Sequence, residues 1–331
     1  MWPRFTAGVA ETVAPATGVS QSTAPKLRGA RQPRGARDFR NTPMGWLYSA
    51  PAVLIFAGFV IVPTFYTFYV SLWHWNVLNP SLSTYKGLGN YRDLLTNVDP
   101  TFLQTLGNSL YFTVGMIVLG TGISLGLALL LMRGGRAMGA ARVMIYLPHA
   151  TPLIATSIIW NWIFEPQFGL ANYLLHLLHL PTSQWTQAQS TAMPSVILFS
   201  VWHEVGFTTL VFLGGLAVIS EETGEAARVD GCGPWREFWY VTWPQLRPVT
   251  TFIVVITSIT SLQAFTQFYQ LTSGGGPNNA TTTLSFLVYK EGIVLGDTGY
   301  GAALAVVLFA VTVLFTLVRR RTAVGGGGLT S

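Results

Sequence analysis

Several ionisable and polar side chains lie inside apolar stretches of this sequence. His203 and Glu204 occur together in SVWHEVGF, and Ser261, Gln263 and Gln267 occur in SLQAFTQF. Charged groups are costly inside a membrane, where they are usually paired or functional. We therefore interpret His203 and Glu204 in two ways: they contact a polar solute, or they form hydrogen bonds to a partner subunit across an interface.

The sequence supports neither a metal site nor an ATP-binding phosphate motif. His176 and His179, in HLLHL, are spaced i, i+3 without a third ligand, so we predict no metal site there. The three lysines, Lys26, Lys86 and Lys290, do not occur in a GxxxxGK[ST] phosphate-binding motif. We thus expect that the chain is not an enzyme, and that it holds neither metal nor cofactor of its own.

The segment 220–249, SEETGEAARVDGCGPWREFWYVTWPQLRPV, differs from its apolar surroundings. Ser220 favours the start of a helix whose first turn is acidic, which suits the helix dipole. Gly231 and Gly233, followed by Pro234, end that helix before a second amphipathic segment, WREFWYVTW. The pattern predicts a helix, a glycine turn and a second helix at a membrane surface, whereas an ordinary interfacial loop would need no such pair. The segment contains five of the 13 acidic residues: Glu221, Glu222, Glu225, Asp230 and Glu237.

The elements that position these residues are predicted to be membrane helices. Half of the 331 residues are apolar, only 10% are charged and the mean hydropathy is +0.44. These values are typical of a membrane protein and disfavour a soluble enzyme, a disordered protein and a nucleic-acid binder. Six stretches reach the roughly 20 residues that a bilayer requires. They lie near residues 47–72, 108–132, 143–164, 193–219, 249–271 and 298–318, the third being interrupted at its start by Pro148 and Pro152.

The basic residues predict the orientation of these helices. With both termini in the cytoplasm, 16 of the 19 lysines and arginines fall on the cytoplasmic side. Only Lys86, Arg92 and Lys290 then fall outside. Because loops rich in lysine and arginine stay in the cytoplasm, we expect a multi-pass protein with both ends there.

The acidic segment resembles the EAA loop of permease subunits of binding-protein-dependent ABC importers. The matching residues are Glu225, Ala226, Ala227, Asp230, Gly231 and Pro244. The small alanines let a helix lie close in a groove, Glu225 and Asp230 offer charge partners at its rim, and Gly231 permits the turn. Cys232 and Trp243 depart from the usual residues without removing any of the motif. The resemblance implies that this loop couples the chain to a separate ATPase subunit.

Other stretches are similar to the sugar-permease branch of that family, of the first-permease type found in maltose and glycerol-3-phosphate importers. They are residues 87–95, 146–172 and 271–292. The implied fold is an all-α membrane protein with six transmembrane helices, the type I ABC importer permease fold. The implied organisation is a disordered basic cytoplasmic tail at 1–42, a transmembrane permease domain at 43–322 with its coupling loop at 220–248, and a flexible glycine-rich tail at 323–331.

The resemblance also implies partners and a location. The chain would pair with a second homologous permease in a bacterial or archaeal cell membrane. Two ATPase subunits would bind ATP and Mg²⁺, and an extracytoplasmic solute-binding protein would deliver a sugar.

In the maltose-type family the sugar site draws on the fourth and fifth helices. The positions that match it here are Ser200, His203, Glu204, Phe207, Ser261 and Gln263. Glu204 favours a neutral sugar, because an ionised carboxylate repels an anionic one. Two alternatives remain: a glycerol 3-phosphate or polyol permease of the same family, and an ion-coupled secondary transporter. The latter would need charged relay residues in several helices, and only His203 and Glu204 qualify.

Overall fold

The computed structural model describes residues 43–77, 79–96, 101–132 and 135–324. The predicted basic tail at 1–42 lies outside these residues, and so do residues 325–331 of the predicted glycine-rich tail. Residues 323–324 belong to the last helix, so the boundary predicted after residue 322 lies within that helix. Across the described residues the regular structure is helical, apart from one antiparallel pair of short strands.

Short 3₁₀ or π turns, labelled η, connect or interrupt the α-helices. The elements are, in chain order, α1 (Pro43–Phe56), η2 (Ala57–Ile61), α2 (Val62–Val70), β1 (Trp73–His74), η3 (Pro80–Leu82), β2 (Thr84–Tyr85), α3 (Gly89–Leu95), α4 (Thr101–Gly115), η4 (Met116–Gly120), α5 (Thr121–Leu131), α6 (Arg136–Ala150), α7 (Leu153–Ile163), α8 (Leu170–Leu177), η5 (Trp185–Gln187), α9 (Gln189–Ala217), α10 (Glu221–Val229), α11 (Pro234–Glu237), η6 (Phe238–Thr242), α12 (Trp243–Leu262), α13 (Thr266–Leu271), η7 (Pro277–Asn279), α14 (Leu284–Tyr289), η8 (Lys290–Val294) and α15 (Thr298–Val324).

The chain forms two compact units that divide between Phe56 and Ala57. In the first unit the described residues form α1 alone, an uncharged apolar helix with Pro51 in its interior. The second unit contains all the other elements, including every side chain discussed below.

Five helical segments are long and apolar enough to cross a membrane, as judged by length and composition over the described residues. They are Tyr48–Val70, Phe102–Leu131, Gln189–Ala217, Pro234–Leu262 and Thr298–Leu317. The pair α6 and α7 passes the same test together but is bent by 96°. The prediction of an all-α membrane protein is therefore confirmed, whereas the count of six holds only if this bent pair is one span.

The third predicted span, 143–164, is not one continuous helix. Pro152 disfavours the helical conformation for the residue before it, and Thr151 is indeed extended, with φ −89° and ψ 149°. The helix stops at Ala150 and restarts at Leu153 in a new direction. Thr151 compensates part of the break locally, because its hydroxyl donates to the Pro148 carbonyl at 2.6 Å.

The fifth predicted span, 249–271, is displaced towards the N-terminus. Its helix begins at Pro234 and runs to Leu262, so Pro244 and Pro248 lie within it rather than before it. The π turn η6 precedes Pro244, and a π turn can absorb a local irregularity without ending the helix. The helix ends at Leu262, and α13 is a separate short helix.

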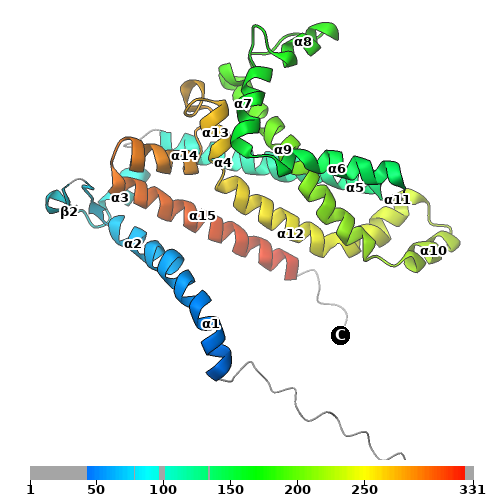
Figure 1. Ribbon diagram of the computed structural model, residues 1–331, viewed down its shortest axis with the longest axis horizontal. Helices are drawn as coiled ribbons and strands as arrows, with labels where there is room; N and C mark the ends of the chain where they lie inside the picture. The colour runs from blue at the N-terminus through cyan, green and yellow to red at the C-terminus, as the bar shows by residue number, and fades with distance from the viewer. Residues whose placement is uncertain (1–42, 78, 97–100, 133–134, 325–331) are drawn as a thin grey trace, which may run out of the picture. The chain divides into compact units, whose positions relative to one another are not determined.

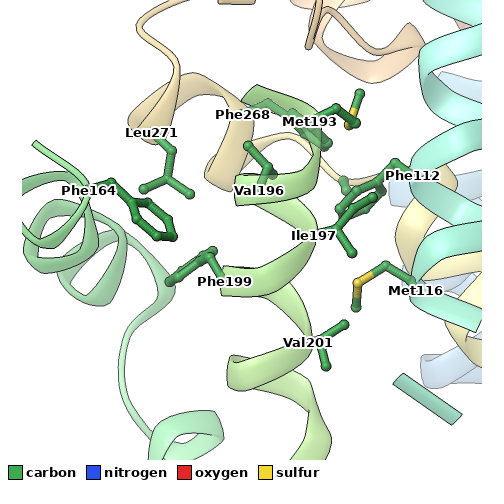
Figure 2. Close-up of a cluster of buried hydrophobic side chains, with 11 residues drawn as sticks. Phe112, Met116, Phe164, Met193, Val196, Ile197, Phe199, Val201, Phe268 and Leu271 are labelled. Atoms are coloured by element: carbon green, nitrogen blue, oxygen red, sulfur yellow. The ribbon is translucent and has the colours of Figure 1, made fainter. Parts of the chain in front are cut away.

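The long helix α9 packs against α5, α6 and α12 within the second unit (Figure 1). Just over half of its most apolar window is buried, the largest share among the candidate spans. Figure 2 shows a cluster of buried hydrophobic side chains that α9 shares with α4 and α13. In this cluster the Phe112 and Phe268 rings pack edge to face, with 4.8 Å between their centroids. Because lipid tails are as apolar as these side chains, such contacts stabilise a membrane bundle through close packing rather than through removal of water.

The backbones of α6 and α9 meet at Gly206. A Cβ atom added at Gly206 would overlap the Ile145 carbonyl oxygen and the Tyr146 backbone. Glycine is therefore required for this approach, which brings the C-terminal end of α6 against the middle of α9.

We expect Gly206→Ala to lower the thermal unfolding temperature of the full chain in detergent. The added methyl forces the two backbones apart, a type of overpacking that costs about 1–3 kcal/mol. Gly214→Ala is the matched control on the same helix, since a Cβ at Gly214 meets nothing within 4 Å. Its unfolding temperature should stay the same or rise, because alanine favours a helix over glycine by about 1 kcal/mol. Equal temperatures for the two variants would contradict the close approach.

Candidate functional site

A small cavity of about 60 Å³ lies where α9 and α12 approach the junction of α4 and η4. Its polar lining combines a serine hydroxyl from each long helix with an imidazole, a carboxylate and a carboxamide. The polar residues that line it are Ser200, His203, Glu204, Thr260, Ser261 and Gln267. The lining is thus rich in hydrogen-bonding groups, although apolar helices surround it.

A larger cavity of about 280 Å³ adjoins the first one. Both cavities are bordered by Met116, Glu204 and Thr260, and the larger one adds His149 and Phe207. This volume is close to the lower end of the range typical of small-molecule sites, about 300–1,000 Å³. Glu204 borders both spaces, and its side chain is 46% exposed.

The structure brings most of the predicted substrate-path residues together. Ser200, His203, Glu204 and Ser261 line the small cavity, and Phe207 lines the larger one. Gln263 is placed elsewhere: it is exposed at the C-terminal end of α12, and its carbonyl accepts a hydrogen bond from the Ser285 hydroxyl. The helix α12 ends at Leu262, and the chain changes direction before α13. The buried carboxamide at the small cavity is therefore that of Gln267 in α13, four residues after Gln263.

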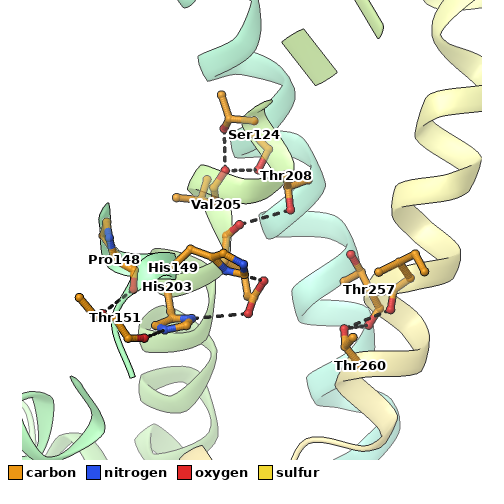
Figure 3. Close-up of polar contacts among 12 residues, drawn as sticks. Ser124, Pro148, His149, Thr151, His203, Val205, Thr208, Thr257 and Thr260 are labelled. Atoms are coloured by element: carbon orange, nitrogen blue, oxygen red, sulfur yellow. Dashed lines mark hydrogen bonds and ion pairs between the residues drawn. The ribbon is translucent and has the colours of Figure 1, made fainter. Parts of the chain in front are cut away.

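Sequence reasoning missed His149, which lies beside Glu204. The Nδ1 atom of His149 is 3.3 Å from one Glu204 carboxylate oxygen, and Nδ1 of His203 is 3.5 Å from the other (Figure 3). His149 lies on α6, between the prolines that were treated only as an interruption. Its position beside Glu204 depends on the approach of α6 and α9 at Gly206, for which the sequence offered no signal.

Aromatic rings accompany these polar groups. The Phe207 ring stacks on His149 at a centroid distance of 5.0 Å and an interplanar angle of 18°. Trp202 packs against Trp160 at 5.1 Å. Apolar ring faces beside hydrogen-bonding groups suit a solute that has both hydroxyl groups and an apolar ring face.

Of the helix pair predicted for the acidic segment, the first helix is present as α10, whereas the second segment is not a separate helix: α11, η6 and α12 run on as one helix from Pro234 to Leu262. Ser220 occupies the N-cap position of α10 but makes no side-chain capping bond. The helix ends in a Schellman motif, in which Cys232 N–H donates to the Ala227 carbonyl and Gly231 N–H donates to the Arg228 carbonyl. Gly231 has φ +80°, which favours glycine strongly, so the Asp-Gly step has a structural cause.

An ion pair ties α10 to α11. The Arg228 guanidinium donates two hydrogen bonds of 3.1 Å to the Glu237 carboxylate, one to each oxygen. Glu225, Ala226 and Asp230 are exposed on α10. Apolar residues are exposed beside them, namely Val229 at 87% and Trp235 at 73%. The segment is therefore a braced helix pair whose motif residues lie mostly at the surface, except for the half-buried Ala227 and Pro244.

The chain is a bundle of apolar helices with a polar cavity between them, and an exposed acidic helix, α10, precedes the penultimate long helix. These features are typical of membrane transport subunits. Residues 119–324 match the family described as "Binding-protein-dependent transport system inner membrane component". The chain belongs to this family, and the expected resemblance to ABC importer permeases is confirmed.

Named relatives cover most of the chain. It is 30% identical to the trehalose/maltose transport system permease protein MalF of Thermococcus litoralis, over 85% of this chain and 93% of the relative. It is 31% identical to the sulfoquinovosyl glycerol transport system permease protein SmoG of Agrobacterium fabrum, over 87% and 94%. A chain in the crystal structure of a bacterial alginate ABC transporter, bound to its alginate-loaded periplasmic protein, has the same fold, with a TM-score of 0.73 at 20% identity. That match covers 87% of this chain and 97% of the other.

We expect Gly231→Ala to loosen the end of α10. A side chain in the left-handed region costs about 1–2 kcal/mol, so the last amides of α10 should exchange hydrogen about 5- to 30-fold faster. Gly233→Ala is the matched control, because Gly233 has an ordinary φ of −73° and a Cβ there also meets open space. Hydrogen exchange read by mass spectrometry on peptides from 221–237 makes the comparison. Identical protection in both variants would be evidence against the Schellman turn.

Proposed function

We propose that this chain is a permease subunit of an ABC importer that moves a neutral sugar across the cell membrane. The observation that carries the proposal is the Glu204 carboxylate on the border of two adjoining cavities, inside a bundle with the fold of the importer family. The chain would carry out no covalent chemistry, and ATP and Mg²⁺ would be bound by partner subunits.

The acidic helix pair supports the proposed coupling to an ATPase. The residues proposed for this role are Glu225, Ala226, Ala227, Asp230, Gly231 and Pro244. The Schellman turn and the Arg228–Glu237 ion pair brace α10 against α11, which is the first turn of the long helix Pro234–Leu262, so a force applied to α10 would pass directly to that helix. The exposed Val229 and Trp235 give the same surface an apolar component, which a docking partner would cover.

The charge of the cavities supports a neutral solute. Among the described residues that line the two cavities there is no lysine or arginine, whereas Glu204 borders both. Relatives and fold neighbours act on both neutral and acidic compounds by their names, since trehalose/maltose stands beside sulfoquinovosyl glycerol and alginate. Family membership therefore leaves the solute open, and the lining of the cavities favours the neutral class.

The proposed assembly contains a second homologous permease, two ATPase subunits and an extracytoplasmic solute-binding protein, with both termini of this chain in the cytoplasm. In this orientation the turn at 272–283 faces outward, towards the binding protein. Asn108 of α4 fixes that turn, because its side-chain amide donates to the carbonyls of Asn279 and Thr282 at 2.9 and 3.0 Å.

We expect Glu225→Lys to assemble in the membrane but to lose sugar-dependent ATP hydrolysis. Reversing a charge on the docking face removes a charged contact of about 1.5–3 kcal/mol, which corresponds to at least a tenfold loss. Thr223→Lys is the control, because it adds the same side chain to an exposed position on the opposite face of α10. ATP hydrolysis by the purified complex in proteoliposomes is the measurement. Normal stimulation in Glu225→Lys would remove this helix from the coupling mechanism.

Glu204→Gln should reduce the maximal rate of sugar uptake about tenfold, because a neutral amide forms weaker hydrogen bonds to sugar hydroxyls than a carboxylate does. The control is Glu165→Gln, since Glu165 lines neither cavity. Uptake of a panel of labelled neutral and anionic sugars into proteoliposomes tests the solute class. Transport of glycerol 3-phosphate in preference to neutral sugars would overturn the inference from Glu204, and uptake without ATP would favour an ion-coupled transporter.

A further inference from the structure

His149, His203 and Glu204 form a group of three side chains of the kinds that bind metal ions. Their nearest ligand atoms all lie within 4.8 Å of one another, although His149 comes from α6 and the other two come from α9 (Figure 3). The carboxylate lies between the two imidazoles, with separations of 3.3 Å to His149 Nδ1 and 3.5 Å to His203 Nδ1.

The surroundings of His203 determine which ring nitrogen carries its proton. Its Nε2 atom is 3.4 Å from the Thr151 carbonyl oxygen, and a carbonyl can only accept, so Nε2 is the donor. In a neutral imidazole the lone pair is then on Nδ1, which faces a carboxylate oxygen. His203 is 5% exposed, so little water can separate the two. A lone pair held against an anion is unfavourable, and either a proton on Nδ1 or a metal ion between the two groups would remove the repulsion.

A hydrogen bond from either Nδ1 atom to the carboxylate is not present in the described residues. Neither Nδ1 atom, of His149 or of His203, has a hydrogen-bond partner among the residues that the structure describes, although both are inaccessible to solvent. A charge-assisted hydrogen bond from an imidazolium to a carboxylate would be about 2.7–2.9 Å long. Both separations are longer than this.

Each imidazole–carboxylate separation is close to the spacing of two ligands on one metal ion, and the three ligand atoms, which lie within 4.8 Å of one another, would draw together around it. Zinc binds histidine nitrogen at about 2.0–2.1 Å and carboxylate oxygen at about 2.0–2.2 Å, so two ligands of a tetrahedral ion lie about 3.4 Å apart. The Thr151 carbonyl would serve as the outer partner that a metal-binding histidine normally has on its other nitrogen. The stacking of Phe207 on His149 holds the second ring in place.

We propose that His149, His203 and Glu204 bind one divalent transition-metal ion of the zinc class, which joins α6 to α9. Two imidazoles and one carboxylate suit such ions and disfavour Mg²⁺ and Ca²⁺, which prefer sets of oxygen ligands. The proposal departs from the expectation that this chain binds no metal, which considered only His176 and His179. It does not rest on the solute or on the direction of transport, and a bound ion would offset the Glu204 charge from which the neutral solute class is inferred.

Metal binding to the full chain in lipid nanodiscs tests the proposal without any transport assay. Zn²⁺ is titrated into the metal-free protein against a chromophoric chelator, and Co²⁺ is added separately as a spectroscopic probe. We expect one equivalent to bind, with visible Co²⁺ bands that Zn²⁺ removes and a tenfold excess of Mg²⁺ does not.

His149→Ala and Glu204→Gln should each weaken Zn²⁺ binding at least tenfold and abolish the Co²⁺ bands. His176→Ala is the matched control, because it removes an imidazole from α8 and should bind like the natural chain. His149 and Glu204 are partly exposed, so these variants keep the buried core, and size-exclusion chromatography verifies that each is folded. If one variant fails to fold, the other decides. Equal Zn²⁺ binding by the natural chain and the folded variants would overturn the proposal and indicate that a proton occupies the group instead.

Discussion

The close approach of α6 and α9 at Gly206 is the constraint on which the polar centre, formed by His149, His203 and Glu204 with the polar residues of the small cavity, depends. The backbones can touch only because Gly206 lacks a side chain. That contact fixes the end of α6, where Pro152 then forces Thr151 out of the helix and turns the chain by 96°. The contact places His149 beside Glu204, and the break directs the Thr151 carbonyl at His203. In a membrane an unsatisfied backbone group costs several kcal/mol, so a polar side chain close to such a break is stabilising.

The composition and the charge-free runs were sufficient to predict the membrane class and most of the spans, because long apolar helices have a strong local pattern. The turn after α10 was equally predictable from the sequence, because Gly231 occupies a backbone conformation with positive φ that favours glycine. The local sequence patterns did not predict the helix bounds correctly at the prolines. Pro152 bends a segment sharply, whereas Pro244 and Pro248 are accommodated within a helix. The sequence of each segment does not distinguish these outcomes, because they depend on which neighbours satisfy the freed carbonyls.

The polar centre shows the same limit. His203 and Glu204 stood out because they interrupt an apolar run, and Ser200 and Ser261 followed from the family resemblance. His149 and Gln267 join them only through tertiary structure: one through the contact at Gly206 and the other through the break after Leu262. Residues that a bend or a break brings into a site lack the periodic spacing that marks a helix face, so an inspection of single helices overlooks them.

The uninterrupted helix from Pro234 to Leu262 has a mechanical consequence. At 1.5 Å per residue its 29 residues span about 43 Å, and its last turn carries Ser261 into the small cavity. If the helix turned as a rigid rod about one end, a tilt of about 5° would displace the other end by about 4 Å. A displacement of that size exceeds a hydrogen-bond length. A modest rocking at the braced end would therefore be enough to make or break the polar contacts at the cavity.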